Sequence, residues 1–571
     1  MTLADRIAAA RGDASSAPAD LLLKNANLVN VLSGEIYLTD VVVHDGYVVA
    51  FGPGYQAKQT IDLGGRYLSP GFIDAHVHIE SSLCTPPEFS RVVLTHGVTT
   101  VITDPHEIAN VLGLEGIRFM LERAKHGPIN MYVMASSCVP ATHMETSGAR
   151  LEAEDLAPLL NSPWVLGLAE MMNYPGVIWG DEGTLDKLAL FEGRVLDGHI
   201  PGVKGRELNA YVAAGIMSDH ECTTVEEALE KLRLGMTVFI REGTTTQNLR
   251  PLLPMVKPEN HHRLCLCTDD RQPSSLIDEG SIDYMVRVAI AEGVDPMMAI
   301  RMGTINTANY FRLHEHGAIA PGRRADMIVF SDLKDLRAEM VFRNGELVAQ
   351  DGVMVREKPP LRKIDLRSSM NAYPDGLDFS IPAQGERIRV IGGRADQVVT
   401  DHLVEDARIV EGEAVVDLDR DILKMAVVER HRASGQIGKG FIHGFGLKRG
   451  AIAGSVAHDH HNLVIIGADD DSMRAAARAV IEMGGGLVAH DGERVLATLA
   501  LPVAGLMSEE PLNEVRRQYD ALIAAAQSMG SGMYDPFMAM SFMALEVIPS
   551  LKLTDLGLVD VERFELVDLF Q

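Results

Sequence analysis

Two histidines stand two positions apart at the end of a short apolar run near the start of the chain. The run is Phe-Ile-Asp-Ala-His-Val-His at 72–78, and the histidines are His76 and His78. Side chains two residues apart on a β-strand point to the same side, so both imidazoles would face one point. Two imidazoles that face one point suit a metal ion. A pair of surface histidines on an edge strand is the alternative, and for this spacing alone we weigh the two about equally.

Other apolar runs along the chain also end in residues that can bind metals or move protons. They are Asp104, Ser136, Glu170, His199, His220 and Asp269. An isolated histidine after an apolar run is most often structural, but a whole series of such run ends is harder to explain in that way. Histidine and carboxylate together suit a divalent ion that keeps room for water. Two histidines from one strand, two from neighbouring strands and a bridging Glu170 can hold two ions close together.

The elements that would position these residues are strands that alternate with helices between Pro70 and Phe311. The expected strands are 72–78, 98–103, 129–136, 164–170, 195–199, 214–219, 236–240 and 263–269, and a helix capped by Thr224 is expected at 224–234. About eight strands, each followed by a helix, indicate an α/β protein with a parallel (β/α)8 TIM-type barrel. A doubly wound open sheet is the alternative. A barrel places its chemistry at the C-terminal strand ends, where the polar residues above lie.

The segments on both sides of this barrel have a different pattern. Short apolar runs that turn at Asp45-Gly46 and Asn344-Gly345 indicate β-hairpins. We predict that 1–69 and 317–356 form one small β domain beside a catalytic barrel at 70–316. The run 357–360 reads as a linker, and 361–571 is predicted to be an α+β domain. Its expected strands are 387–391, 414–418 and 424–428, and its expected helices are 473–483 and 514–526.

The composition excludes several classes of protein. The chain has 571 residues and a formal net charge of −27, so no excess of lysine and arginine is present to meet the phosphates of a nucleic acid. The N-terminus lacks a secretory signal pattern, and no apolar run is long enough to span a bilayer, so no membrane partner is expected. Five cysteines without zinc-ribbon spacing fit a reducing, cytoplasmic location.

Several of these motifs resemble those of a known family. The run at 70–78, the single histidines His199 and His220, Asp269 and the segment at 317–326 resemble the amidohydrolase superfamily of metal-dependent barrel hydrolases. Within it, the chain looks most similar to the bacterial adenine deaminases. The closer match lies in the motifs at 78–82, 103–107, 169–175, 197–199, 218–221, 268–270 and 532–537. The resemblance therefore covers almost the whole chain.

This resemblance implies hydrolytic deamination of adenine, a small purine base, to hypoxanthine and ammonia in purine salvage. It implies one or two divalent ions (manganese, iron or zinc) held by His76, His78, Glu170, His199, His220 and Asp269. Cyclic-amide hydrolases of the superfamily bridge two ions with a carboxylated lysine at the position of Glu170, whereas a glutamate bridges without modification. Asp269 would also take a proton from the attacking water. A homodimer or larger oligomer is common in the superfamily.

The roles of three further groups of residues stay open. Asp104, His106 and Glu107 either begin a helix, with Asp104 as its cap, or contact the substrate or an auxiliary metal ion. Glu221 can act as a second catalytic residue at a purine nitrogen, but only from a loop, because neighbours on a strand point in opposite directions. The run Ala-His-Asp-His-His at 457–461 is by default a surface loop, with a metal or active-site role as the alternative.

Two other functions remain open. A different amidohydrolase that cleaves a cyclic amide or an N-acetyl group would use the same barrel, but Glu170 in place of lysine and the long C-terminal region disfavour it. A non-catalytic scaffold with the same fold would usually lose metal ligands, whereas this chain keeps the full set. Activity on a panel of substrates separates the first alternative, and metal analysis tests the second.

Overall fold

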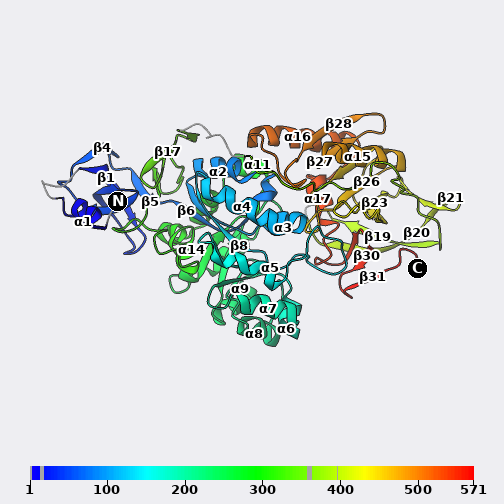
Figure 1. Ribbon diagram of the computed structural model, residues 1–571, viewed down its shortest axis with the longest axis horizontal. Coiled ribbons are helices and arrows are strands. Elements are labelled where there is room, and N and C mark those ends of the chain that lie inside the picture. The colour runs from blue at the N-terminus through cyan, green and yellow to red at the C-terminus, as the bar shows by residue number, and fades with distance from the viewer. Residues whose placement is uncertain (1–2, 13–17, 356–362, 395–396) are drawn as a thin grey trace.

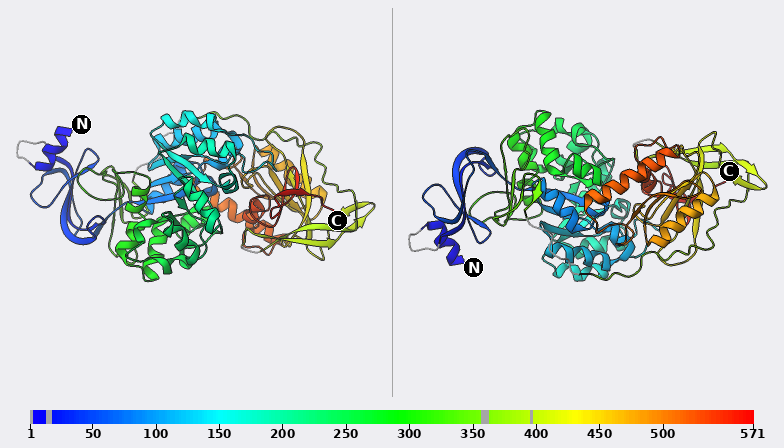
Figure 2. Two further views of the ribbon diagram at one scale, coloured as in Figure 1. Left: turned by 90° about the horizontal axis from the view of Figure 1, so that it is seen from below. Right: turned by 90° about the horizontal axis from the view of Figure 1, so that it is seen from above.

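Three parts of the chain follow one another along the long axis of the molecule (Figure 1). The structure is a computed structural model that describes all residues except 1–2, 13–17, 356–362 and 395–396. A small sheet lies at the end that holds the N-terminus, helix-covered parallel strands lie in the middle, and a second large sheet lies at the C-terminal end. The two side views show the same succession (Figure 2). The predicted linker 357–360 lies outside the described residues.

The small sheet combines strands from both flanks of the central part. Its order is β18-β17-β16-β15-β5-β1-β2-β3, with β4 paired to β1, and β5 pairs antiparallel with β15 from Pro70 opposite Met327. The strands are β1 (Ala19–Asn30), β2 (Glu35–His44), β3 (Tyr47–Phe51), β4 (Ala57–Asp62), β5 (Tyr67–Pro70), β15 (Met327–Phe330), β16 (Met340–Arg343), β17 (Glu346–Gln350) and β18 (Val353–Met354). Helix α1 (Leu3–Arg11) precedes them. Both predicted hairpin turns form, and Asp45-Gly46 and Asn344-Gly345 have positive φ, as such tight turns require.

The central part consists of parallel strands in two sheets. The larger sheet has the order β10-β9-β8-β7-β6-β14, and the smaller has the order β11-β12-β13. Every residue of β6, β7, β12 and β13 is buried, which explains why these strands read as continuous apolar runs. The strands are β6 (Phe72–His78), β7 (Val98–Thr103), β8 (Asn130–Ala135), β9 (Val165–Met171), β10 (Val195–Gly198), β11 (Ser218–Asp219), β12 (Thr237–Arg241), β13 (Leu264–Cys267) and β14 (Asp269–Asp270).

The strand order excludes one of the two predicted sheet types. Strands β6 to β10 lie side by side in sequence order, and β14 closes onto β6 from the other side. A doubly wound sheet would reverse its order in the middle, so that alternative is wrong. The smaller sheet adjoins the larger one at both ends, because β13 leads into β14 through Thr268 and the Met217 N–H donates to the Leu196 carbonyl at 3.3 Å.

Helices cover the outside of these strands (Figures 1 and 2). Thr224 caps α9 as predicted, since its hydroxyl accepts the Glu227 N–H. Among the described helices, none is long and apolar enough to cross a membrane. The longer helices are α2 (Pro86–Thr95), α3 (His106–Leu112), α4 (Leu114–His126), α6 (Tyr174–Trp179), α7 (Glu182–Leu190), α8 (Gly205–Ala213), α9 (Val225–Arg233), α11 (Pro273–Asp278), α12 (Ile282–Ala291), α13 (Pro296–Met302) and α14 (Ile305–Tyr310), with short turns α5 (Ala153–Leu156) and α10 (Leu249–Leu252).

One predicted strand is mostly wrong. The run 214–219 forms a strand only at Ser218–Asp219, because helix α8 extends to Ala213. Ala214 is the C-cap of that helix, and Gly215 follows with φ +91°, the left-handed conformation that commonly follows a helix. The apolar residues that suggested a strand therefore belong to the end of a helix and its exit turn.

The C-terminal part is built on an eight-stranded sheet of order β20-β19-β24-β23-β26-β25-β27-β28, covered by the long helices α15 (Asp470–Met483) and α16 (Leu512–Ser528). A further helix, α17 (Pro536–Phe542), lies nearer the central part (Figure 1). The strands are β19 (Arg387–Gly393), β20 (Thr400–Asp406), β21 (Arg408–Val410), β22 (Glu413–Val415), β23 (Ile422–Val428), β24 (Ile437–His443), β25 (Ala451–Gly454), β26 (Leu463–Gly467), β27 (Gly486–His490), β28 (Val495–Ala500), β29 (Leu551–Thr554), β30 (Gly557–Asp560) and β31 (Glu565–Val567).

The C-terminal part docks onto the loop that follows β8. The Thr146 N–H donates to Asp555 Oδ1 at 2.9 Å, and the Thr554 hydroxyl donates to the Met144 carbonyl at 2.6 Å. Asn462, in the loop between β25 and β26, donates from Nδ2 to the Thr146 carbonyl at 2.9 Å. This contact places the β25–β26 loop at the C-terminal ends of the parallel strands.

Candidate metal centre and active site

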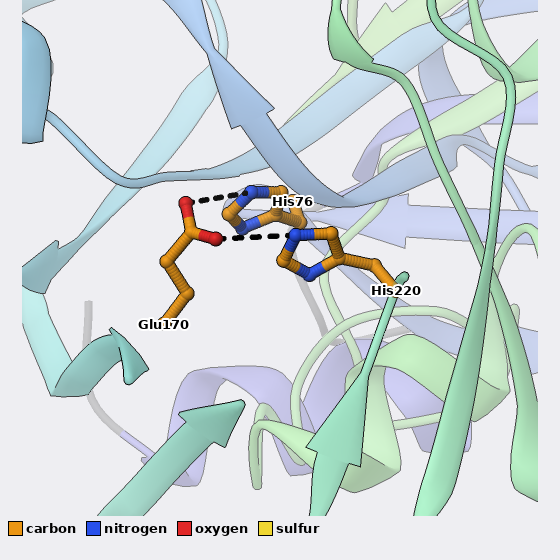
Figure 3. A group of neighbouring side chains, drawn as sticks. All are labelled: His76, Glu170 and His220. Atoms are coloured by element: carbon orange, nitrogen blue, oxygen red, sulfur yellow. Dashed lines mark ion pairs between the residues drawn. The ribbon is translucent and has the colours of Figure 1, made fainter. Parts of the chain in front are cut away.

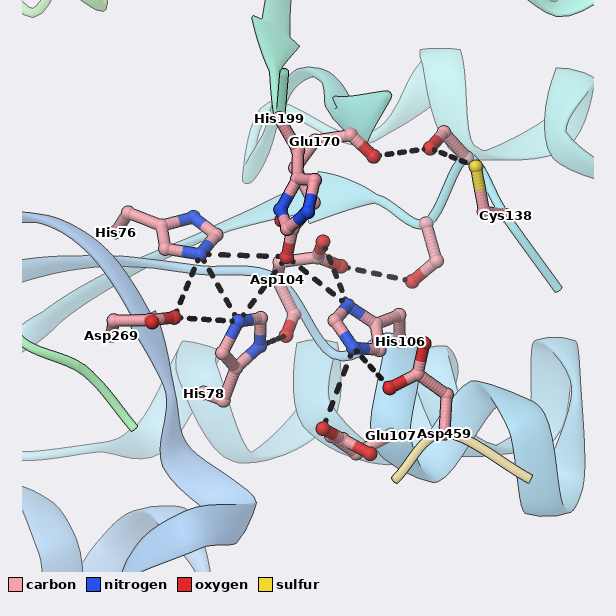
Figure 4. A network of polar contacts seen from close by, with 12 residues as sticks. His76, His78, Asp104, His106, Glu107, Cys138, Glu170, His199, Asp269 and Asp459 are labelled. Carbon is pink, nitrogen blue, oxygen red and sulfur yellow. Dashed lines mark hydrogen bonds and ion pairs between the residues drawn. The ribbon is translucent and has the colours of Figure 1, made fainter. Parts of the chain in front are cut away.

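His76 and His78 lie at the C-terminal end of β6, inside the sheet and not at its edge. Their Nε2 atoms are 3.1 Å apart, and both side chains are buried (Figure 4). His78 Nδ1 lies 3.0 Å from the Asp104 carbonyl, which can only accept, so the proton of a neutral His78 is on Nδ1. Nε2 then carries a lone pair directed at His76. The edge-strand interpretation is therefore wrong, because two such nitrogens face one point in the interior.

Glu170, at the end of β9, joins two pairs of histidines. Its Oε1 lies 3.5 Å from His76 Nε2 and 3.2 Å from His78 Nε2. Its Oε2 lies 2.8 Å from His199 Nδ1 and 3.2 Å from His220 Nε2. Figure 3 shows one oxygen of Glu170 facing His76 and the other facing His220. Each carboxylate oxygen thus faces its own pair of imidazoles, which is the arrangement of a bridging ligand.

Asp269 completes the group from the start of β14. Its Oδ1 lies 3.4 Å from His76 Nε2 and 3.1 Å from His78 Nε2. All six predicted ligands are therefore gathered at the C-terminal ends of neighbouring strands. His199 is the most exposed of them, with 22% of its side chain accessible, so the group opens to solvent on that side.

The distances within this group fit a metal ion. Two ligand atoms bound to one ion by bonds of about 2.1–2.2 Å lie about 3.0–3.6 Å apart at right-angle to tetrahedral geometry. The His76, His78, Glu170 Oε1 and Asp269 contacts measure 3.1–3.5 Å, inside that interval. Imidazole and carboxylate donors accept manganese, iron or zinc. The residues present therefore fit a divalent metal centre.

The basic side chains of the group stabilise the charged form of its carboxylates. Burial would raise the pKa of Glu170, but the imidazoles of His220 and His76 and the bond from His199 hold that pKa well below its usual range. Burial also opposes ionisation of Asp269, yet Arg241 and the bonds from His76 and His78 keep its pKa well below the usual value. Both carboxylates are thus ionised at neutral pH, as metal ligands must be.

Asp104 and His106 contact the ligand cluster and do not simply begin a helix. Helix α3 begins at His106 with Pro105 at its N-cap position, so the prediction that Asp104 is the cap is wrong. The Asp104 carboxylate instead lies 3.1 Å from His106 Nδ1 and accepts the Ser136 hydroxyl at 3.2 Å. His106 Nδ1 is also 3.4 Å from Glu170 Oε1 (Figure 4). The second strand end therefore contributes directly to the ligand cluster.

Glu221 lies in the loop conformation that its predicted role requires. Strand β11 ends at Asp219, and the side chains of His220 and Glu221 turn to the same side, with 3.4 Å between His220 Nε2 and Glu221 Oε1. Arg241, which the sequence did not single out, binds both candidate catalytic acids. Its Nη1 donates to Asp269 Oδ2 at 3.0 Å, and both of its terminal nitrogens contact the Glu221 carboxylate.

The histidine-rich run at 457–461 is not a surface loop. His458 and His461 are 4% and 1% exposed, and both contact the carboxylate of Glu107, the residue that follows His106 on α3. The default interpretation is therefore wrong, and the C-terminal part of the chain reaches the vicinity of the ligand cluster.

Comparison with known proteins places this geometry in a family. Residues 67–348 match the model of the amidohydrolase family, and residues 397–565 match that of the adenine deaminase C-terminal domain. The chain is 52% identical to an adenine deaminase of Desulfatibacillum aliphaticivorans over 99% of both chains. It is 49% identical to adenine deaminase 2 of Carboxydothermus hydrogenoformans over 96% of this chain and 97% of that one. Similarity of this extent, across both parts, shows that the chain belongs to the adenine deaminase family of amidohydrolases.

Proposed function

We propose that this chain hydrolyses adenine to hypoxanthine and ammonia and thereby serves purine salvage. The observation that supports adenine as the substrate is the similarity to adenine deaminases along the full chain, including the C-terminal domain. The geometry supports a metal-dependent hydrolase but by itself fits several substrates. An unmodified Glu170 between two pairs of histidines supports a two-ion centre without carboxylated lysine.

Two groups of residues would hold the ions. His76, His78 and Asp269 would hold one, and His199 and His220 the other, with Glu170 between them. A bound divalent ion, manganese or iron by preference and zinc as a further option, lowers the pKa of a water molecule toward neutrality. Asp104, His106 and Glu107 would contact the substrate or bind an auxiliary metal ion beside this centre.

Asp269 is the proposed general base. Its Oδ1 lies beside His76 and His78, while Arg241 holds Oδ2 and so fixes the plane of the carboxylate. From this position it accepts a proton from the water that adds to the amino-bearing carbon of adenine and passes that proton to the ring nitrogen. It then takes the second water proton from the hydroxyl of the adduct and passes it to the departing amino group, which leaves as ammonia. Water thus supplies the oxygen of hypoxanthine, and no oxidant or reductant is needed.

Glu221 is the proposed contact to the purine ring. Burial opposes its ionisation, but Arg241, His199 and His220 keep its pKa below the usual range, so it is a carboxylate at neutral pH. A carboxylate accepts hydrogen bonds. Glu221 is therefore suited to hold a ring N–H of the purine once the ring nitrogen is protonated.

We further propose that the two parallel sheets are parts of one (β/α)8 barrel. The connections at Thr268 and between Met217 and Leu196 support closure. The proposed division is a composite β domain at 1–69 and 317–356, the barrel at 70–316 and the C-terminal domain at 361–571. A homodimer and a cytoplasmic location complete the proposal, and five buried thiols fit a reducing compartment.

The test is release of ammonia from adenine by protein loaded with manganese or ferrous iron, with adenosine, cyclic amides and N-acetyl sugars alongside. Turnover of adenine alone supports the proposal. Turnover of a cyclic amide or N-acetyl substrate in place of adenine would support the proposed metal centre but refute adenine as the substrate. A protein that binds no metal and turns over none of these compounds would be a scaffold.

A further inference from the structure

The β25–β26 loop places two histidines of the C-terminal domain on Glu107 of the barrel. His458 Nδ1 lies 2.5 Å from Glu107 Oε1, and His461 Nε2 contacts Glu107 Oε2. Both oxygens of this carboxylate are thus held from outside the barrel. Glu107 itself is 1% exposed, so water does not compete for these bonds.

The loop that carries these histidines is itself firmly held. The His458 ring stacks on Phe542 of α17 with ring centroids 4.8 Å apart and an interplanar angle of 15°. The Arg430 guanidinium donates to the carbonyls of His461 and Ala504. Together with the bond from Asn462 to Thr146, these contacts fix both rings against the barrel.

Glu107, His458 and His461 have the composition of a metal site, but their geometry is that of a hydrogen-bonded group. The backbone N–H of Ala457 donates to His461 Nδ1 at 3.1 Å, so neutral His461 carries its proton on Nε2. That nitrogen then has no lone pair for an ion and donates to Glu107. His458 Nδ1 likewise lies at hydrogen-bonding distance, 2.5 Å, from Glu107 Oε1.

Glu107 connects these histidines to the candidate centre. Its Oε1 lies 3.4 Å from His106 Nε2, and Asp459 Oδ1 of the same C-terminal loop lies 3.7 Å from that nitrogen (Figure 4). The other nitrogen of His106 faces Asp104 at 3.1 Å and Glu170 at 3.4 Å. A continuous series of polar contacts therefore runs from the C-terminal loop through Glu107 and His106 to the bridging carboxylate.

We propose that His458 and His461 are positioning residues of the deaminase, through which the C-terminal domain sets the orientation of Glu107 and His106 beside Glu170. This inference rests on the proposed function only for its kinetic test. A carboxylate held at one oxygen can rotate about its χ angles, whereas one held at both cannot. Loss of such supporting contacts around metal centres costs roughly 10–100-fold in activity or metal affinity.

Four variants and one matched control test the proposal. His458→Leu and His461→Leu remove the donors, while His458→Asn and His461→Gln keep an N–H near the position of Nδ1 and Nε2 respectively. The control is His460→Asn in the same loop, where the new amide oxygen can replace His460 Nδ1 as acceptor of the Asn462 N–H. His460 is equally buried, so the control reports on general damage to the loop.

The measurements are kcat and KM for adenine, metal content per chain, and the electron paramagnetic resonance spectrum of manganese-loaded protein. We expect the leucine variants to lose roughly 10–100-fold in kcat with KM within about threefold and with unchanged metal content. Their spectra should change, whereas the asparagine and glutamine variants and the control should resemble the wild type in spectrum and regain most of kcat.

Three results would overturn the proposal. Leucine variants with the kcat and spectrum of the wild type would show that the contacts do not matter. A deficit of one ion per chain that persists at saturating manganese would show that the trio itself binds an ion. Asparagine and glutamine variants as impaired as the leucine variants would indicate packing alone. Because the spectrum needs no turnover, it tests the positioning role even if the wild type proves inactive on adenine, which would count against the proposed function alone.

Discussion

A single buried lysine outside the ligand cluster supports two of the ligand loops, and its removal is the most informative perturbation. Lys231 of α9 is fully buried. Its Nζ donates to Asp219 Oδ2 at 2.9 Å, to Glu227 Oε1 at 2.8 Å and to the Ile200 carbonyl at 2.8 Å. Asp219 immediately precedes one predicted metal ligand, and Ile200 immediately follows another. We therefore predict that Lys231→Met both destabilises the central part of the chain and weakens metal binding.

The magnitude follows from the charges left behind. Methionine fills most of the space but leaves two buried carboxylates without their counter-ion, and breaking a buried ion pair in this way costs about 3–5 kcal/mol. For a domain of this size, 1 kcal/mol shifts the unfolding temperature by about 2–4 °C, so a decrease of roughly 6–20 °C is expected. Metal content should fall in parallel, because the loops that carry His199 and His220 lose a common support.

The assay is thermal unfolding of metal-loaded and metal-free protein, with metal content measured on the same samples. Lys448→Met is the matched control, since its Nζ donates to the Leu418 carbonyl at 2.8 Å in an exposed position, and it should cost less than about 1 kcal/mol. Adding Asp219→Asn and Glu227→Gln to Lys231→Met removes the uncompensated charges and should restore part of the stability. An unfolding temperature for Lys231→Met within about 2 °C of the wild type would refute the reasoning.

Three further predictions concern the centre and the C-terminal domain. Asp269→Asn should keep the fold but lower kcat by at least about 100-fold, because an amide cannot accept the proton; near-normal turnover would remove Asp269 from the mechanism. Chelation should lower the unfolding temperature, and added manganese should raise it in a concentration-dependent way. At 100 times the dissociation constant, the gain in unfolding free energy is about 2.7 kcal/mol. An unfolding temperature that does not change with manganese would contradict a metal site in the folded state. Burial raises the pKa of Asp535 from 3.8 to about 6. Because the folded state then binds more protons than the unfolded state, Asp535 stabilises the folded state at low pH, and this contribution is lost as pH rises through 6. Asp535→Asn removes this contribution. The unfolding free energy of the wild type relative to that of the variant should therefore increase by at most about 1.4 kcal/mol between pH 8 and pH 5. A difference between the two proteins that does not depend on pH would refute the assignment.

The ligand cluster could be predicted because parallel strands end at a common edge. His76, Glu170 and Asp269 each follow an apolar run, and the strand order brings those ends together. Arg241 escaped prediction for two reasons. Its strand was expected to end at Ile240, one residue earlier, and a search for metal ligands does not select arginine.

The contacts of the C-terminal loop could not be predicted from local patterns. Glu107 and His458 are separated by 351 positions and meet only because two parts of the chain dock. Periodicity reports which face of an element is buried, not which distant element covers it. The failed strand at 214–219 has a local cause, since an apolar run beside Gly215 fits a helix end as well as a strand.

The small sheet, which combines strands from both flanks of the central part, has a consequence for synthesis of the protein on the ribosome. Strand β5 ends at Pro70, yet its partner β15 begins at Met327, roughly 260 residues later. At about 5–20 residues per second, the growing chain carries an unpaired edge of β5 for about 13–50 s. Such an edge can pair with another chain, so aggregation during expression should depend on the time between these two segments. Slower translation of the central part would lengthen that exposure, while a chaperone that shields β1–β5 would reduce the pairing with other chains.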